Sequence, residues 1–114
     1  MKIEKFEDLV CWKKSQSFII EIYKVFSSCK DYSFKDQIVR AAVSISNNIA
    51  EGFERLSNKD FRKFLYISKG SCGEVRSMLY LSKELKYVTE EEFNFLYNQS
   101  IEISKILSGL IKSL

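Results

Sequence analysis

The sequence predicts an all-α protein, an antiparallel up-down-up-down four-helix bundle formed by a single domain over residues 1–114. Proline is absent and glycine occurs only four times, whereas a β-sandwich needs many turns that are rich in both residues. Apolar residues recur at steps of three and four, which is the period of a helix with one buried face. A repeated helix-start pattern divides the chain into long helices with short connections, and such connections make sequential helices antiparallel.

The first helix is expected over residues 8–28, after a short charged segment at residues 1–6. Asp8 is placed to cap this helix, because an aspartate side chain accepts a hydrogen bond from a free amide of the first turn. Its apolar positions follow the a/d spacing of a bundle helix. We therefore expect a buried seam that consists of Leu9, Trp12, Gln16, Ile19, Tyr23 and Phe26.

Three later helix starts share one pattern, in which a hydroxyl residue is followed three positions on by a carboxylate. The hydroxyl accepts from an amide of the first turn, and the carboxylate accepts from the amide of the cap residue. The pairs are Ser33 with Asp36, Ser57 with Asp60, and Thr89 with Glu92. Two starts also carry the apolar pair of a hydrophobic staple, Leu56 with Phe61 and Val88 with Phe93. The remaining helices are therefore predicted at about residues 34–55, 58–86 and 90–113.

The predicted second helix is apolar on two sides. One stripe contains Ile38, Ala41, Ile45 and Ile49, and a second contains Val39, Val43, Ala50 and Phe53. A helix that is apolar over most of its circumference is either central or lies at a subunit interface. Because a bundle of four encloses none of its helices, the second stripe indicates self-association; a wide core face is the alternative.

The third and fourth helices show the same seam spacing. The expected seam residues are Phe61, Phe64, Ser68, Cys72, Val75, Leu79 and Ser82 in the third helix, and Phe93, Leu96, Ser100, Ile103, Leu107 and Leu110 in the fourth. Gly70 and Gly73 lie inside the third helical pattern. They do not indicate a phosphate loop, because the strand before such a loop and its GK[ST] ending are both missing.

The composition excludes the common kinds of catalytic and metal site. Histidine is absent, which removes the commonest general base and the commonest metal ligand. Cys11, Cys29 and Cys72 are an odd number without paired spacing, which argues against disulfides and against zinc. We therefore expect no enzymatic activity, no cofactor and no metal. Reduced cysteines, no signal peptide and no long apolar run predict a cytoplasmic protein without a membrane partner.

Polar residues scattered through the apolar second and third helices predict an internal network that fixes the helix register. A carboxylate in such surroundings must be paired or hydrogen-bonded, or it takes up a proton. A carboxylate metal site of the di-iron type is the alternative, but that site needs Glu-x-x-His pairs, which are absent. The expected members of the network are Arg40, Ser44, Asn48, Glu51, Ser71 and Glu74. Glu51 is also the first carboxylate to inspect for catalysis.

Basic residues concentrate between Arg55 and Arg76, although the net charge of the chain is only +3. Steps of three and four place several of them on one face of the third helix, together with Tyr66. The residues predicted to contact nucleic-acid phosphates are Lys13, Lys14, Arg55, Lys59, Arg62, Lys63 and Lys69. On one subunit a solvated helix face is the favoured explanation of this pattern, but a symmetric ring would join such faces into a continuous positive surface.

The sequence resembles the bacterial four-helix-bundle family named for proteins encoded in intervening sequences of 23S ribosomal RNA genes. The residues that carry the resemblance are Asp8-Leu9, Trp12-Lys13, Gln37, Arg40-Ala41-Ala42-Val43-Ser44-Ile45, Asn48-Ile49-Ala50-Glu51-Gly52, Arg55, Phe61, Phe64-Leu65, Gly70-Ser71 and Glu74. Cys11 stands where the family usually has an aliphatic residue, and Ser46 where proline is common. These departures concern helix starts and loops.

The resemblance implies a bundle that assembles into a cyclic homo-oligomer, a pentamer, with a basic surface for RNA or DNA and no enzymatic activity. It extends to the accessory variability protein of diversity-generating retroelements, which partners a reverse transcriptase. We therefore expect a non-enzymatic, oligomeric nucleic-acid-binding or accessory protein. The alternative is a protein-interaction scaffold, such as a reverse-transcriptase accessory subunit, that does not bind nucleic acid itself.

Overall fold

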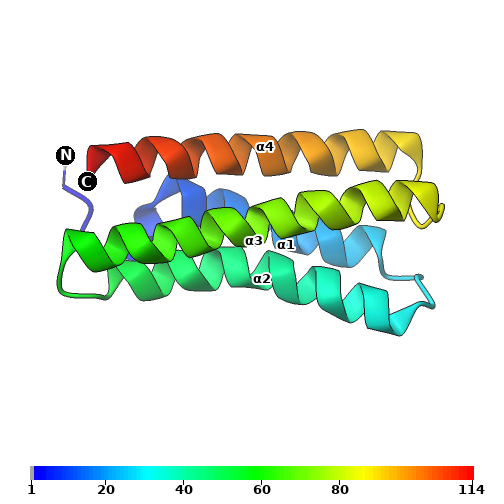
Figure 1. Cartoon of the computed structure of the whole chain (residues 1–114), viewed down its shortest axis with the longest axis horizontal. Helices are drawn as coiled ribbons and strands as arrows, with labels where there is room; N and C mark the ends of the chain where they lie inside the picture. Colours follow the sequence, from blue (N-terminus) through cyan, green and yellow to red (C-terminus); the bar gives the residue numbers. More distant parts are fainter. Residues whose placement is uncertain (1) are drawn as a thin grey trace.

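A computed structural model describes residues 2–114, and Met1, the first residue of the expected charged lead-in, lies outside them. The described chain contains no strand and consists of a short 3-10 turn and four long helices (Figure 1). The elements are η1 (Phe6–Asp8), α1 (Val10–Val25), α2 (Tyr32–Phe53), α3 (Asn58–Glu84) and α4 (Glu90–Ser113). Sequential helices run antiparallel, so the prediction of an all-α fold with four helices is confirmed.

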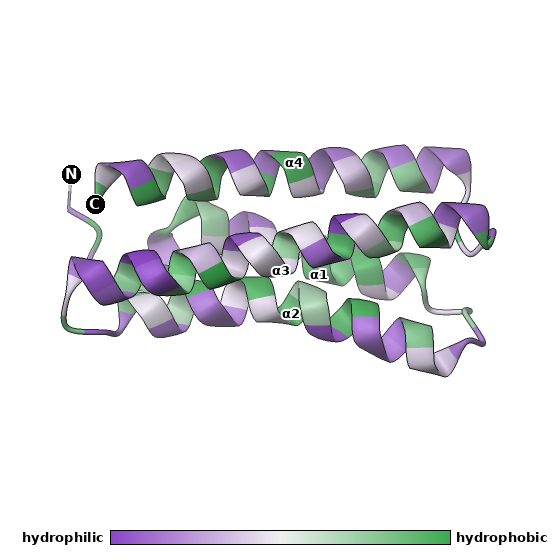
Figure 2. Ribbon diagram, in the orientation of Figure 1, coloured by the Kyte–Doolittle hydropathy of each residue, from purple (hydrophilic) through white to green (hydrophobic). Residues whose placement is uncertain are grey.

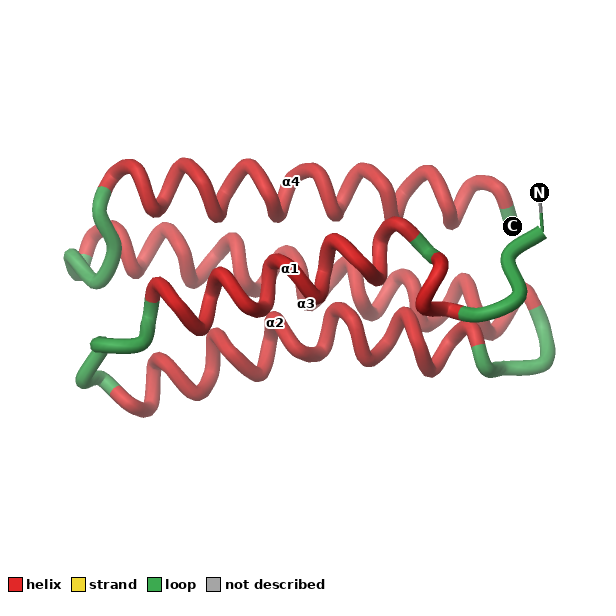
Figure 3. The backbone as a smooth tube through the Cα atoms, turned by 180° about the vertical axis from the view of Figure 1, so that it is seen from behind, coloured by secondary structure: helices red, strands yellow, loops and turns green. Residues whose placement is uncertain are grey.

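Each helix packs against the helices that precede and follow it in the sequence, and the first helix also packs against the last. Helix α2 packs on α1 and α3, and α4 packs on α3 and α1, whereas α1 and α3 do not pack against each other within residues 2–114. The overlap of α1 and α3 in Figure 1 is therefore one of projection, and the reverse view in Figure 3 places α1 on the near side and α3 behind it. Helices α1 and α3 form one diagonal of the bundle.

One hydrophobic core runs the length of the bundle between inward-facing stripes, and Figure 2 shows polar and apolar residues alternating along each helix. The predicted seam of α2 is confirmed, because its four residues are all buried. In α3 and α4 the predicted seams are also buried, apart from the half-buried Phe64 and Leu110. Two of the three seam serines are satisfied within their own helix: Ser82 donates to the carbonyl of Met78 at 2.8 Å, and Ser100 to that of Tyr97 at 2.7 Å.

The predicted seam of α1 is confirmed at its two ends, where Leu9 and Phe26 are buried, but between them it is wrong by about one helical position. Its fully buried face consists of Cys11, Ser15, Phe18 and Ile22, whereas Tyr23 is 51% exposed and the side chains of Trp12, Gln16 and Ile19 are half-buried. One residue turns a helix by about 100°, so the apolar stripe chosen from the sequence lies on the flank of the true seam. The large ring of Trp12 instead packs edge-on against Phe6 of η1, with centroids 5.4 Å apart.

Two of the four predicted caps are confirmed. The hydroxyl of Ser57 accepts from the amide of Asp60 at 3.1 Å. Thr89 and Glu92 form a complete capping box, in which the threonine hydroxyl accepts from the Glu92 amide at 3.1 Å and the Glu92 carboxylate accepts from the Thr89 amide at 2.9 Å. These contacts satisfy amides that the first turn leaves without helical partners.

The caps predicted at Asp8 and Ser33 are wrong. Asp8 ends η1, and α1 begins at Val10 without a side-chain cap. Helix α2 begins two residues early because Asp31 caps it, accepting from the Phe34 amide at 3.2 Å. The hydroxyl of Tyr87 also donates to Asp31 at 2.7 Å, so a residue from the distant α3–α4 connection holds this cap in place.

The helix ends and one staple also differ from the prediction. Helix α1 ends at Val25 instead of residue 28, α2 at Phe53 instead of 55, and α3 at Glu84 instead of 86. Lys86 has a φ of 61°, in the left-handed region that stops a helix. The staple predicted between Leu56 and Phe61 is wrong, because the Leu56 side chain is fully exposed while Phe61 is buried.

Candidate nucleic-acid interface

The solvent side of α3 presents two lysines without carboxylate partners. Lys59, Lys63 and Tyr66 are exposed and follow one another at steps of four and three, so they lie on one face of the helix. The face opposite them carries the buried Leu65 and Cys72. The ion pairs found within residues 2–114 involve neither Lys59 nor Lys63. These two ammonium groups are therefore available to an external anion.

Two other predicted contacts on α3 are partly covered. The guanidinium of Arg62 donates to the backbone oxygen of Leu114 at 2.7 Å, which ties the first turns of α3 to the last residue of the chain. Lys69 is half-buried. The five residues from 59 to 69 that the sequence places on one face therefore divide into three exposed residues and two half-buried ones.

Arg55 lies just before α3 and already has two partners. Its guanidinium donates to the carboxylate of Glu51 at 2.7 Å and lies over the ring of Phe64, 4.7 Å from its centroid. The ion pair is exposed, and such a pair one helical turn apart contributes only a few tenths of a kcal/mol. The ring and the carboxylate hold the cation beside the start of α3, where it remains accessible to solvent.

The two lysines predicted on α1 lie far from the α3 cations. Lys13 is exposed, and Lys14 forms an ion pair with Glu102 of α4 at 3.3 Å. Because α1 and α3 are diagonal in the bundle, the structure does not bring Lys13 and Lys14 together with the lysines of α3 in one subunit.

Half of the predicted polar network forms, where α2 packs against α3. The hydroxyls of Ser44 and Ser71 are 2.9 Å apart, and the side-chain amide of Asn48 donates to the Ser44 hydroxyl at 2.9 Å and to its carbonyl at 2.8 Å. These side chains are partly buried. The three residues join the two helices at one level and so help to fix their register.

The charged members predicted for this network are not part of it. Glu51 is exposed and pairs with Arg55 instead. Arg40 and Glu74 are exposed, and neither belongs to an ion pair found within residues 2–114. Because all three side chains reach water, none needs an internal partner. The prediction that Arg40, Glu51 and Glu74 belong to an internal network is therefore wrong, although Glu51 is paired, as a carboxylate at this position was expected to be.

Two contacts between α2 and α3 were not anticipated. The hydroxyl of Ser68 donates to the carbonyl of Ile45 at 2.8 Å, inside the core. Gly52 lies against α3 so closely that a methyl group there would be 2.6 Å from the Cβ of Phe64. The signal for Gly52 was present in the sequence, because it continues the buried stripe three residues after Ile49.

Cys11 and Cys72 are buried thiols with raised pKa values, and they belong to no metal-binding cluster in the described part of the chain. Burial raises the pKa of Cys11 to about 11, and it raises the pKa of Cys72 against the opposing effect of Arg76. Both are therefore thiols at neutral pH, and the thiolate is the nucleophilic form. Within residues 2–114, no three acidic or cysteine side chains are grouped to hold a metal ion. The described helices include none with the length and apolar character needed to cross a membrane.

Known proteins are similar to this chain over nearly its whole length. A profile of the 23S rRNA-intervening sequence protein family matches residues 7–109. A crystal structure from Bacteroides thetaiotaomicron VPI-5482, described as a protein of unknown function from the S23 ribosomal protein family, superposes with a TM-score of 0.85 at 33% identity, covering 90% of this chain and 99% of that one. No curated protein matches significantly. The resemblance drawn from the sequence is confirmed: this chain belongs to the 23S rRNA-intervening sequence protein family.

Proposed function

We propose that this protein is a non-enzymatic nucleic-acid-binding protein whose α3 solvent face contacts phosphates. The observation that carries the proposal is the pair Lys59 and Lys63, which are exposed, lie on one face and have no carboxylate partner in the described chain. Tyr66, 60% exposed, adds a ring on which a base can stack one turn further along. Arg55 lies near the start of the same helix, over the ring of Phe64.

Oligomerisation is the second part of the proposal. Two lysines on one subunit give a weak and mostly non-specific attraction, whereas a cyclic homopentamer would present five such faces to one nucleic acid. The second apolar stripe of α2 supports self-association, because Val39, Val43 and Ala50 are only half-buried in the single chain. A partner subunit on this stripe would remove them from water.

A protein-binding scaffold is the second candidate, and it has its own observation. Along the solvent side of α3, the lysines of the first half give way to apolar residues toward its end, where Leu81 is 54% exposed and Leu85, the residue after the helix, is 50% exposed. Tyr32, at the start of α2, is 67% exposed. Exposed apolar side chains of this kind are suited to binding another protein, for example a reverse transcriptase.

Binding to a structured RNA at several salt concentrations tests the first proposal. Each phosphate contact lowers the logarithm of the affinity by about 0.7 to 0.9 per tenfold rise in salt. The double variant Lys59→Glu with Lys63→Glu should therefore weaken binding and reduce the slope by about 1.4 to 1.8 for each subunit engaged. Lys24→Glu with Lys30→Glu makes the same charge change near the end of α1, which lies at the opposite end of the bundle from the start of α3, and should retain the slope. Equal losses in both double variants would show that total charge, and not the α3 face, controls binding.

Light scattering tests the oligomer independently. A pentamer at micromolar protein supports the assembly, and a monomer would remove it together with most of the case for nucleic acid. If the lysine variants bind RNA as the original protein does, while capture of a protein partner depends on Leu81 and Leu85, the scaffold function replaces the nucleic-acid function.

A further inference from the structure

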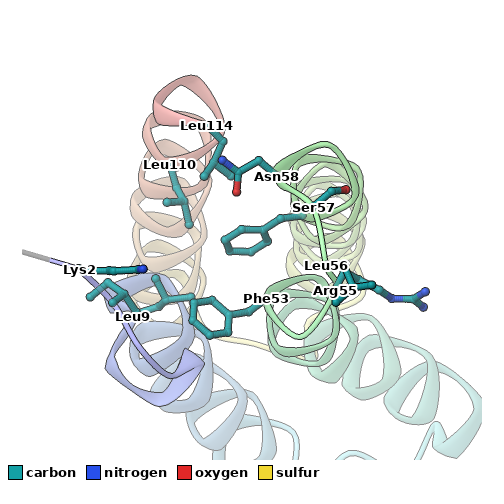
Figure 4. A pocket seen from close by; sticks show the side chains of 11 residues that line it. Lys2, Leu9, Phe53, Arg55, Leu56, Ser57, Asn58, Leu110 and Leu114 are labelled. Carbon is teal, nitrogen blue, oxygen red and sulfur yellow. The ribbon is translucent and has the colours of Figure 1, made fainter.

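An apolar cavity of about 340 Å³ opens at the end of the bundle, where the α2–α3 connection and the last turn of α4 meet (Figure 4). Its apolar walls come from Leu9 before α1, Phe53 of α2, Phe61 of α3, and Leu110 and Leu114 at the end of the chain. Leu9 and Phe61 are buried, and the other three are half-buried. Small-ligand sites commonly have volumes from about 300 Å³ upward and mostly apolar walls.

A second cavity of about 270 Å³ lies next to the first and shares three of its wall residues, Ile3, Leu9 and Leu110. At the rim of the larger cavity, the Leu56 side chain is fully exposed to water. Two adjoining hollows with a common wall suit a flexible hydrocarbon chain better than a compact ring system. Such a chain would also cover Leu56.

The charged side chains around the larger cavity are cationic. Lys2 extends its ammonium group over the cavity, whereas the guanidinium of Arg55 points away from it, toward solvent (Figure 4). Ser57 and Asn58 also line the cavity, so the positive end of the α3 dipole faces it. The acidic Asp8 lines only the smaller cavity. An anionic group is therefore favoured in the larger cavity and disfavoured in the smaller one.

We propose that this end of the bundle binds an anionic amphiphile, a straight-chain carboxylate. Its head lies beside Lys2 and the first turn of α3, and its hydrocarbon chain fills the cavity between Leu9, Phe61 and Leu110. The site does not use Lys59 or Lys63, so it stands independently of the nucleic-acid proposal.

Octanoate, titrated below the concentration at which it forms micelles, is the probe for this site. Isothermal calorimetry should show saturable binding, and hexanoate should bind about sixteenfold more weakly, because each buried methylene contributes about a factor of four. Octylamine carries the same chain with the opposite charge and should bind more weakly than octanoate. Backbone resonances of Phe61, Leu110 and Leu114 should shift during the titration.

Two variants distinguish specific recognition of the carboxylate head by Lys2 from a general attraction of the anion to positive charge. Lys2→Gln should weaken octanoate binding by about twofold to fivefold, the range for an exposed charge pair. Lys5→Gln removes the same charge from an exposed residue that lines neither cavity and should leave the affinity unchanged. Circular dichroism of both variants should match the original protein.

Three results would each overturn the proposal. Octanoate showing no saturable binding means that the cavity takes no such ligand, as when a second copy of the chain fills it. Equal affinity for octylamine and octanoate would refute the anionic head. Resonance shifts confined to the middle of the bundle would place the ligand elsewhere.

Discussion

Replacing Gly52 by alanine is the sharpest test of how α2 and α3 pack. A methyl group at this position would lie 2.6 Å from the Cβ of Phe64 and 3.1 Å from a ring carbon of Phe61. The Cβ of Phe64 is fixed by its own backbone, so a change of rotamer cannot relieve the clash and the two helices must move apart. Overpacking of this kind costs about 1 to 3 kcal/mol.

The helical gain from alanine opposes this cost and must be measured separately. Alanine is about 0.8 to 1 kcal/mol more favourable than glycine inside a helix. Gly70→Ala and Gly109→Ala provide the controls, because a methyl group at either position meets no atom within 4 Å. Both control variants should therefore gain about 1 kcal/mol in their free energy of unfolding. Gly52→Ala should fall below them by the overpacking cost.

Urea unfolding followed by circular dichroism measures the difference, with all variants at one protein concentration because self-association would add to stability. We expect the free energy of unfolding of Gly52→Ala to be about 1 to 3 kcal/mol lower than that of Gly70→Ala. A Gly52→Ala variant as stable as the two controls would show that α2 and α3 have room to adjust, and that the glycine is not required for their contact.

Three further predictions concern a cap, a carboxylate and a thiol. Thr89→Ala should lower the free energy of unfolding by about 1 kcal/mol, whereas Ser33→Ala, outside any cap, should have little effect in the same urea experiment. The Tyr87 hydroxyl and a backbone amide lower the pKa of Asp31, so its contribution to stability is present above about pH 4 and lost as the pH falls through the lower folded value. Asp31→Asn should therefore weaken the acid dependence of unfolding, and an unchanged pH profile would contradict the assigned contact. Cys11, with its pKa raised to about 11 by burial, should resist alkylation at neutral pH until the protein unfolds, as mass spectrometry of its peptides would show.

Local signals in the sequence were sufficient for the helices but not for every boundary. Thr89 and Ser57 cap as predicted because each partner lies within one turn of the same helix. Asp31 and Ser33 are both suitable caps, two residues apart, and the structure uses Asp31, which also accepts from Tyr87, a partner 56 residues away. Short-range patterns contain no information about that contact.

The seam of α1 failed for a related reason. Two apolar stripes lie side by side on this helix, and both satisfy the spacing of a bundle seam. The buried stripe is the one with small residues, Cys11 and Ser15, followed by Phe18 and Ile22. The choice between them depends on the space that the other helices leave, which periodicity does not describe.

In the candidate interface, too, the sequence predicted relations within one helix but not contacts between helices. Helical spacing correctly indicated that Lys59, Lys63 and Tyr66 share a face, because that relation lies within one helix. It could not indicate that Arg62 donates to the backbone of Leu114, nor that Lys13 belongs to the helix diagonal to α3. Which helices are neighbours is a property of the bundle and not of any one segment.

Because only some of the cations are free, the dependence of RNA affinity on salt concentration can show how many subunits take part in binding. One subunit offers two exposed lysines without ion-pair partners on the solvent face of α3, and two phosphate contacts account for a slope of at most about 1.8. A larger measured slope requires cations away from this face, such as the half-buried Lys69 or Lys13 of α1, cations that are now engaged within the subunit, or lysines from further subunits. Arg62 and Arg55 would have to break existing contacts before they could bind phosphates. Additional phosphate contacts from further subunits therefore cost less free energy. A slope well above 1.8 would therefore favour several subunits acting on one nucleic acid, and assembly and binding would then be lost together.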